Sequence, residues 1–217
     1  MEASFWHQRW QDNEIGFHEA QVNPRLIEHL PKLKLQTGDR IFVPLCGKTV
    51  DIGWLLSQGY RVVGAELSEL AIQQLFEELG MEAKVADNGA VRLYQADGLD
   101  VFVGDIFDLT AEQLGPVHAV FDRGALIALP QATREQYTAH LRNITHTAPQ
   151  LLITLVYDQS LLPGPPFSIS DEEVQSHYAQ SYTPTLVEAC EQEGGLKGIH
   201  DVLINVWTLL PNTEQTR

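Results

Sequence analysis

The chain is predicted to fold as an α/β protein with a doubly wound, mainly parallel sheet. Apolar, strand-sized segments alternate with amphipathic helical segments along most of its 217 residues, and this alternation is typical of parallel sheets covered by helices. Residues 40–66 give the clearest unit: a strand at 41–45, a turn at Gly47, a short helix and a second strand at 61–65. Because no repeat or Gly/Ser linker divides the chain, we expect a single domain over residues 1–217.

The elements around this unit carry recognisable end signals. Before it, Asn23-Pro24 is typical of a helix start, with Leu26, Ile27 and Leu30 facing inward and Pro31 closing the helix. After it, Ser68 is placed to cap a helix that ends at Gly80. Residues 84–104 favour a hairpin, with strands at 91–95 and 100–104 and a turn at residues 97–98.

The second half continues the alternation. A strand is predicted at 117–122, and Thr133 with Gln136 predicts a capping box for a helix that reaches Thr147. Residues 151–157 form the most continuous apolar strand, as in the buried part of a sheet. Ser170 with Glu173 predicts a further capped helix, and strands near 183–188 and 203–210 are expected as antiparallel additions at one edge.

Ligands of such sheets bind beyond the carboxyl ends of the strands. The residues expected at those ends are 45–48, 66–68, 105–106, 122–123 and Asp158. Glu66 follows Gly47 by 19 residues, close to the spacing at which nucleotide-binding folds place a carboxylate that binds ribose hydroxyls. An adenosine-like ligand is therefore predicted. The aromatic-rich residues 1–25 are a candidate lid over this site.

Three adenosine-containing ligands can be compared. Gly47-Lys48-Thr49 resembles the end of a phosphate-binding P-loop, but Phe42 stands where that loop needs its first glycine. A dinucleotide site needs a G-x-G-x-x-G run, and this turn has one glycine. S-adenosylmethionine, which carries no phosphate, suits the turn best. An NAD-dependent oxidoreductase and a non-catalytic S-adenosylmethionine sensor remain as alternative classes.

The composition limits the partners. With 29 acidic against 14 basic side chains, the formal net charge is −15, and such a surface disfavours nucleic acid and anionic membranes. The first residues lack the basic start and apolar stretch of a signal peptide, so we expect a cytoplasmic protein. Cys46 and Cys190 are the only cysteines and are expected to be free thiols. Nothing in the sequence demands more than a monomer acting on a small molecule.

Several strings together resemble the thiopurine S-methyltransferase family, in its bacterial branch. They occur in family order from about residue 5 to 210: Trp6-x-x-x-Trp10 with Gly16-Phe17-His18, Val43-Pro44-Leu45-Cys46-Gly47-Lys48, Val63-Gly64-Ala65-Glu66-Leu67-Ser68, Asp105-Ile106-Phe107-Asp108, Phe121-Asp122-Arg123-Gly124-Ala125-Leu126 and Pro163-Gly164-Pro165-Pro166-Phe167. The resemblance implies a class I, Rossmann-like methyltransferase with a seven-stranded sheet.

The resemblance also implies the chemistry. The cofactor would be S-adenosyl-L-methionine, leaving as S-adenosyl-L-homocysteine, and the acceptors would be aromatic or heterocyclic thiols such as thiopurines. Selenium or tellurium species are further implied acceptors, with a role in tellurite or selenite detoxification. The implied cofactor contacts are Trp10, Leu45, Glu66, Asp105, Ile106 and Arg123, and Phe17 would line the acceptor pocket with Arg123 nearby.

Several residues have two interpretations. Trp10 would cover the cofactor or only fasten the N-terminal helix, and Arg123 would contact the cofactor carboxylate, steer an anionic acceptor, or form a structural ion pair with a neighbouring aspartate. Cys46 is not expected to be a nucleophile, because methyl transfer from a sulfonium needs no covalent intermediate. No catalytic acid or base is assigned. The eight histidines lack the paired spacing of metal-binding helices, so no metal is predicted.

Two segments bear on the acceptor. Pro165-Pro166-Phe167 resembles the Pro-Pro-aromatic loop of amino-group methyltransferases, but it follows the fifth strand of the predicted sheet rather than the fourth, and is expected to form a stiff wall of the pocket. Residues 191–198 depart from the animal members of the family, which place a second substrate-side arginine there. Lys197 is the only basic residue in this stretch.

Overall fold

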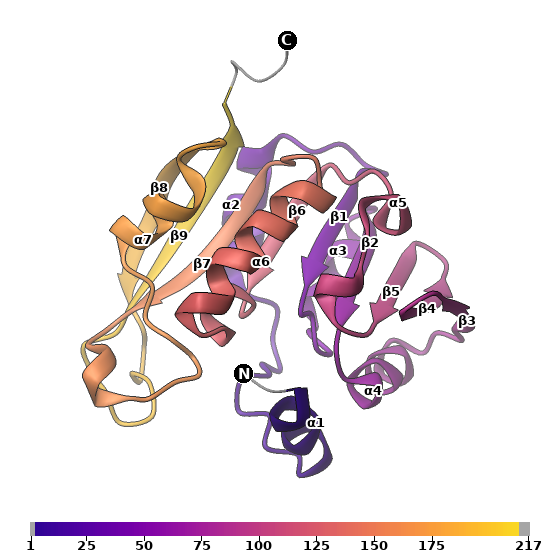
Figure 1. Cartoon of the computed structure of the whole chain (residues 1–217), viewed down its shortest axis with the longest axis horizontal. Helices are drawn as coiled ribbons and strands as arrows, with labels where there is room; N and C mark the ends of the chain where they lie inside the picture. Colours follow the sequence, from indigo (N-terminus) through magenta and orange to yellow (C-terminus); the bar gives the residue numbers. More distant parts are fainter. Residues whose placement is uncertain (1–2, 213–217) are drawn as a thin grey trace.

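A nine-stranded mixed sheet with helices on both faces forms the centre of the computed structural model, which describes residues 3–212 (Figure 1). The strand order is β3-β4-β5-β2-β1-β6-β7-β9-β8. The strands are β1 Arg40–Pro44, β2 Arg61–Glu66, β3 Lys84–Asn88, β4 Val91–Ala96, β5 Leu99–Val103, β6 Ala119–Arg123, β7 Gln150–Val156, β8 Tyr182–Glu191 and β9 Leu203–Pro211. The α-helices are α1 Ala3–Gln11, α2 Pro24–His29, α3 Asp51–Ser57, α4 Glu69–Leu79, α5 Ala111–Leu114, α6 Gln131–Ile144 and α7 Asp171–Tyr178. The 3-10 helices are η1 Leu30–Leu33, η2 Ile106–Asp108, η3 Leu126–Ala128 and η4 Gln159–Leu161.

The topology confirms the doubly wound α/β prediction and corrects its strand number. Strands β5, β2, β1, β6 and β7 are parallel, and β9 and β8 add antiparallel strands at one edge, as the sequence predicts. The expected seven strands are wrong for the described residues, because the antiparallel hairpin of β3 and β4 extends the other edge. The first two residues of the expected lid and the last five of the expected domain lie outside the described part of the chain.

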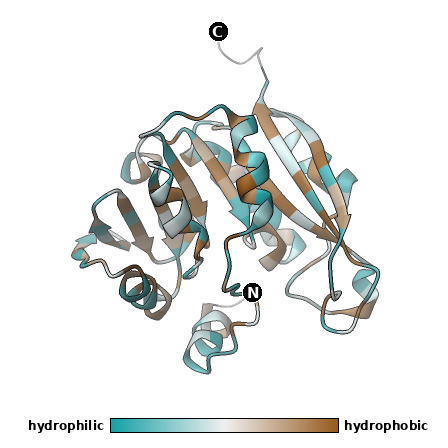
Figure 2. Cartoon of the chain, turned by 180° about the vertical axis from the view of Figure 1, so that it is seen from behind, coloured by the Kyte–Doolittle hydropathy of each residue, from teal (hydrophilic) through white to brown (hydrophobic). Residues whose placement is uncertain are grey.

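Two apolar layers enclose the sheet. Along β1, Phe42 packs with α6 and α7 on one face, while Ile41 and Val43 pack with α2, α3 and α4 on the other. All three side chains are at most 2% exposed, so the parallel strands are buried on both faces, as such strands require. Figure 2 shows the resulting brown bands along the central strands.

One predicted side-chain direction and one predicted helix start need correction. Ile27 is 47% exposed, whereas Leu26 and Leu30 are buried as predicted. Helix α2 ends at His29, and Pro31 lies within the 3-10 helix η1 that follows it. The capping box of Thr133 and Gln136 does not form. The N-cap of helix α6 is Pro130, three residues before the expected one, and its carbonyl accepts hydrogen bonds from the N–H groups of Thr133 and Arg134. The caps at Asn23, Ser68 and Ser170 are confirmed.

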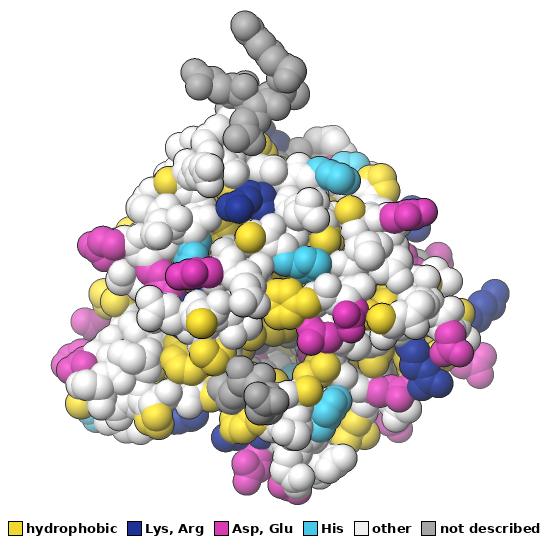
Figure 3. All heavy atoms as spheres, in the orientation of Figure 1, with side chains coloured by type: hydrophobic (Ala, Val, Ile, Leu, Met, Phe, Trp, Pro, Cys, Tyr) yellow, Lys and Arg dark blue, Asp and Glu magenta, His cyan; other side chains and the backbone are white. Residues whose placement is uncertain are grey.

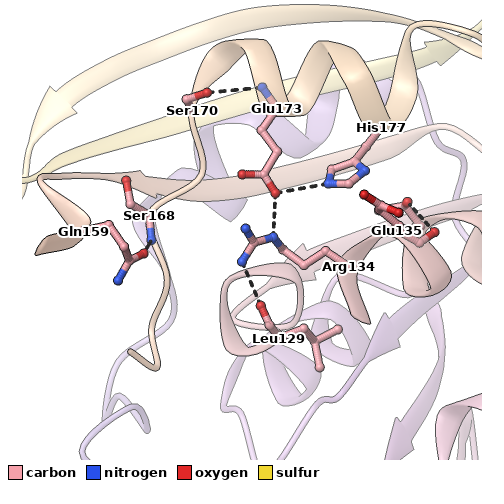
Figure 4. A network of polar contacts seen from close by, with 9 residues as sticks. Leu129, Arg134, Glu135, Gln159, Ser168, Ser170, Glu173 and His177 are labelled. Atoms are coloured by element: carbon pink, nitrogen blue, oxygen red, sulfur yellow. Dashed lines mark hydrogen bonds and ion pairs between the residues drawn. The ribbon is translucent and has the colours of Figure 1, made fainter. Parts of the chain in front are cut away.

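Helices α6 and α7 are joined by a buried charge network (Figure 4). Arg134, 5% exposed, donates from Nε to Oε1 of Glu173 at 2.6 Å and from Nη1 to the Leu129 carbonyl at 2.9 Å. His177 contacts the same Glu173 oxygen at 3.2 Å. The guanidinium of Arg134 also lies 5.7 Å from the ring centroid of Phe167, so this network packs against the proline-rich loop.

The helices also bear on membrane association. Among residues 3–212, none of them is both long enough and apolar enough to cross a bilayer.

Candidate functional site

The turn after β1 and the end of β2 are joined by the side chain of Glu66. Its Oε2 accepts a hydrogen bond from the Gly47 N–H at 2.8 Å, and its Oε1 accepts one from the Ser68 N–H at 2.8 Å. The side chain is 7% exposed. Burial raises the pKa of Glu66, and the two backbone hydrogen bonds oppose that rise by favouring the carboxylate. A carboxylate oxygen has two lone pairs, so each oxygen retains one for a ligand hydroxyl.

Trp10 lies directly against this turn. A Cβ built on Gly47 would come within 3.1 Å of Cζ2 of the Trp10 indole, and Gly47 has a φ of +51°. Both facts favour glycine, which has no Cβ and adopts positive φ freely. Trp10 is 4% exposed, so α1 is fastened to the carboxyl ends of the strands. In Figure 1 this indigo helix lies beneath the sheet, beside α4.

The residues before Gly47 are also constrained. Leu45 is half-buried with a φ of +46°, an uncommon conformation for a leucine, and such outliers cluster at ligand sites. The Sγ of Cys46 fills the space above Gly64, where a Cβ would meet it at 2.9 Å. Burial raises the pKa of the Cys46 thiol well above its usual value. A buried neutral thiol suits packing, in keeping with the prediction that Cys46 is no nucleophile.

The segment between α1 and α2 crosses the same end of the sheet. Phe17 stacks edge-on against Trp10 and Trp6, with ring centroids 5.6 and 5.8 Å apart, and is 43% exposed. Glu19 forms an ion pair with Arg123 at the end of β6. The ion-pair partner of Arg123 is therefore this remote glutamate, and not a neighbouring aspartate as one of the alternatives had it.

The aspartate beside Arg123 has other partners. Asp122 is fully buried, and its carboxylate accepts hydrogen bonds from the Tyr137 hydroxyl at 2.7 Å and from the Leu126 N–H at 3.1 Å. Burial raises its pKa to about 6. Through these bonds Asp122 ties the end of β6, where Arg123 lies, both to the loop that follows β6 and to α6.

The other predicted strand-end residues have hydrogen-bond partners of their own. Asp105 is exposed and caps η2 by accepting the Phe107 N–H at 3.0 Å. Ile106 is 8% exposed, and its carbonyl accepts a hydrogen bond from Nε2 of His140 at 2.8 Å. Asp158 caps η4 by accepting a hydrogen bond from the Ser160 N–H at 3.0 Å.

The proline-rich loop is held by three contacts. Tyr157 donates its hydroxyl to the Pro166 carbonyl at 2.6 Å, Phe167 donates its N–H to the Ile127 carbonyl at 2.6 Å, and Nζ of Lys197 donates to the Pro165 carbonyl at 3.1 Å. The contacts from three separate segments agree with the expected stiff wall. Lys197, the lone basic residue of the divergent stretch, lies against this loop.

One cluster in the described chain has metal-ligand residues close together: Glu28, His29 and Glu188, with ligand atoms within 4.8 Å of one another. Arg25 lies 3.2 Å from Glu188 Oε1. Its guanidinium therefore already supplies the positive charge that would neutralise Glu188.

Three features of the site escaped the sequence analysis. Glu19, the buried Asp51 and the support from Tyr137 gave no local signal that assigns them to this site. Asp51 is 1% exposed and accepts the Asn23 N–H at 2.8 Å, which fastens the start of α2 to the turn. A buried acid in the first turn of a helix was visible as a sequence pattern, but its partner was not.

The chain is similar to known proteins along most of its length. The family model "Thiopurine S-methyltransferase (TPMT)" matches residues 1–197. The chain is 51% identical over 210 residues to the thiopurine S-methyltransferase of Xanthobacter autotrophicus, covering 96% of this chain and 99% of the relative. It is 47% identical over 212 residues to that of Teredinibacter turnerae, covering 98% and 99%.

Solved structures share the fold at low identity. The 1,6-didemethyltoxoflavin-N1-methyltransferase of Burkholderia thailandensis, with bound S-adenosylhomocysteine, has a TM-score of 0.65 at 16% identity and covers 96% of this chain and 87% of its own. The magnesium protoporphyrin IX methyltransferase of Synechocystis, also with the demethylated cofactor, has a TM-score of 0.62 at 13% identity and covers 96% and 99%.

Proposed function

Since the chain belongs to the thiopurine S-methyltransferase family, we propose that it transfers a methyl group to the sulfur of small aromatic or heterocyclic thiols such as thiopurines. The protein is an S-adenosylmethionine-dependent methyltransferase with a class I fold. The NAD-dependent oxidoreductase and the non-catalytic sensor are accordingly set aside.

The turn around Gly47 fits the cofactor. Glu66 is buried and accepts two backbone hydrogen bonds, and each of its oxygens keeps a lone pair for a ribose hydroxyl. We assign this role to Glu66, with Leu45 beside it and Trp10 covering the turn. Ile106 would face the adenine ring, and the Asp105 carboxylate would accept a hydrogen bond from the adenine amino group.

Arg123 is proposed to contact the carboxylate of the cofactor or an anionic acceptor. Phe17 is proposed to line the acceptor pocket, because it lies beside Trp10 and remains 43% exposed. Hydrophobic side chains are visible in Figure 3 between the body of the protein and its N-terminal part, a surrounding that suits an aromatic acceptor.

The protein's part in the reaction is alignment. When bound, S-adenosylmethionine supplies an activated methyl group on a sulfonium. The residues of the chain need to hold the acceptor sulfur in line with that methyl group and to exclude water, and such positioning can lower a barrier by about 7–11 kcal/mol. Aromatic thiols ionise readily, so no side chain is assigned as general base. The aromatic rings of Trp10 and Phe17 would also favour a cation nearby, by about 0.5–2 kcal/mol.

The Glu66–Gly47 hydrogen bond is the observation that carries the cofactor assignment, and calorimetry tests it. We expect S-adenosylmethionine and S-adenosylhomocysteine to bind the wild type, NAD not to bind, and Glu66→Ala to weaken both adenosyl ligands. Binding of NAD without either adenosyl ligand would refute the assignment.

The acceptor assignment is tested by product analysis. Incubation with S-adenosylmethionine and thiophenol or 6-mercaptopurine should give the S-methyl product by mass spectrometry. A role in tellurite or selenite detoxification is proposed by family analogy alone. Expression in a sensitive host should then raise resistance and release methylated volatile products, and the absence of both would remove this role.

The remaining proposals concern the setting. We infer a monomer in the cytoplasm that acts on small molecules and binds neither nucleic acid nor membrane, supported by the net charge of −15. Figure 3 shows acidic side chains spread over the visible face. Light scattering on the protein as it elutes from a size-exclusion column would measure its mass and test whether it is a monomer.

A further inference from the structure

Glu19 and Arg123 form an exchangeable ion pair across the acceptor side of the proposed site. The Glu19 side chain is 54% exposed, and the Arg123 side chain is 17% exposed. A guanidinium that is largely buried needs an anionic partner, because an unpaired one would be costly. The exposed carboxylate can leave, however, if another anion takes its place. Any planar carboxylate or similar anion presents the oxygens that a guanidinium binds best.

The segment that carries Glu19 is fastened at both ends by buried contacts. At one end Trp10, 4% exposed, lies against Gly47. At the other end Asn23, 6% exposed, donates its N–H to Asp51 at 2.8 Å. The Glu19 carboxylate therefore stays near Arg123 even when the ion pair opens. A short tether of this kind gives an effective concentration of the order of millimolar, which a free anion has to exceed.

The neighbouring charges leave Arg123 as the partner of Glu19. Two other cations near this segment have partners of their own: Nζ of Lys48 lies 2.7 Å from Oε1 of Glu78, and Arg9 pairs with Glu14. His18 contributes little positive charge, because burial lowers its pKa and Lys48 and Arg123 lower it further. The pairing of Glu19 with Arg123 is thus a specific contact between the N-terminal segment and β6.

We propose that Glu19 determines acceptor specificity by competing with anionic acceptors for Arg123. Its carboxylate occupies Arg123 in the acceptor-free enzyme. An acceptor that carries a negative group besides its reacting sulfur has to displace it, whereas an acceptor without such a group does not. Glu19 therefore weakens the binding of the first kind and leaves the second unaffected. This inference rests on the proposed function, because it takes Arg123 to lie on the acceptor side.

Two thiols that differ by one carboxylate test the competition. 4-Mercaptobenzoate and thiophenol are titrated by calorimetry into the enzyme saturated with S-adenosylhomocysteine, for the wild type, Glu19→Gln, Glu19→Asp and Glu14→Gln. The matched control removes one negative charge from the same segment, since Glu14 pairs with Arg9 and not with Arg123. Glu19→Asp keeps the charge and reports any effect of the substitution on folding.

Glu19→Gln should tighten mercaptobenzoate by about two- to fivefold, as expected for loss of an exposed ion pair, and leave thiophenol unchanged. Glu19→Asp and Glu14→Gln should resemble the wild type. Equal effects of Glu19→Gln on both thiols, no effect on either, an equal gain in Glu14→Gln, or no binding of mercaptobenzoate by any form would overturn the inference.

Failure of the proposed function has a different signature. If both thiols bind but neither is methylated when S-adenosylmethionine replaces S-adenosylhomocysteine, the S-methyltransferase proposal is refuted. The titrations still decide whether Glu19 competes for Arg123, because they measure binding without turnover.

Discussion

The carboxylate of Glu66 accepts the backbone N–H of Gly47 at 2.8 Å, and this bond joins the turn after β1 to the end of β2. The two residues stand 19 positions apart, with α3 between them. A side chain proposed to bind the ribose thus also fixes the turn against which Trp10 packs. If Glu66 binds the ribose as proposed, cofactor binding and the position of the N-terminal helix are coupled through one carboxylate.

Loss of this carboxylate should affect cofactor binding most. Glu66→Ala should raise the dissociation constant of S-adenosylhomocysteine by about 10- to 100-fold, because hydrogen bonds to a charged group contribute about 1.5–3 kcal/mol. It should also lower stability, since the buried N–H groups of Gly47 and Ser68 lose their acceptor. Glu135→Gln on the exposed face of α6 serves as control. Calorimetry and urea unfolding measure the two effects, and unchanged affinity would contradict the assigned role.

A methyl group at Gly47 should separate the α1 contact from backbone strain. In Gly47→Ala the new Cβ would lie 3.1 Å from the Trp10 ring, at a φ of +51°. Gly80→Ala is the matched control, because Gly80 has a φ of +64° and no atom within 4 Å of the new Cβ. Both variants should lose about 1 kcal/mol from the positive φ, and Gly47→Ala should in addition bind the cofactor more weakly. Equal cofactor affinities of Gly47→Ala and Gly80→Ala would show that Trp10 can move away from residue 47 without affecting cofactor binding.

Asp122 should make stability fall as the pH rises from about 4 to 6. Its pKa is raised from 3.8 to about 6 by burial, so in this range the folded protein binds more protons than the unfolded chain, and the free energy of unfolding decreases with pH. The loss of unfolding free energy is complete above the pKa of Asp122 in the folded protein and absent below its pKa in the unfolded chain. The shift corresponds to about 3 kcal/mol.

Urea unfolding of wild type and Asp122→Asn at pH 4, 5, 6 and 7 measures this contribution. The asparagine does not titrate, so the stability of the wild type relative to the variant should decline from pH 4 to 6 and then level off. A difference that is constant over the whole series would show that Asp122 titrates near its ordinary pKa. The variant should also lose stability at every pH. In Asp122 one oxygen accepts the Tyr137 hydroxyl and the other accepts the Leu126 N–H, and the asparagine amide replaces one of these two oxygens by an NH2 group that cannot accept.

The charge network beneath the proline-rich loop should contribute to stability as a unit. Arg134→Leu removes the partner of Glu173 and should cost about 3 kcal/mol, the lower end of the range for breaking a buried pair, because the Glu173 side chain is 20% exposed. The double variant Arg134→Leu with Glu173→Leu should recover part of this loss. Additive losses in urea unfolding would instead show that the two side chains act independently.

Local patterns predicted the elements of this fold where local chemistry decides them. The caps at Ser68 and Ser170, the strands on either side of Gly47 and the antiparallel late strands all follow from hydrogen bonding and periodicity within a few residues. Errors arose where a neighbour outcompeted the pattern. Pro130 starts α6 before the expected capping box, and Ile27 lies on the exposed side of α2 although it is apolar.

The sequence by itself determined the order of strands and helices, the residues at the strand ends and the position of Glu66 relative to Gly47. These depend on chain neighbours and on the two periodicities of strand and helix. Only the tertiary structure decided the partners: Glu19 for Arg123, Trp10 for Gly47 and Tyr137 for Asp122. Such pairs join segments far apart in the chain, and their geometry exists only once the parallel strands have brought their carboxyl ends to the same edge of the sheet.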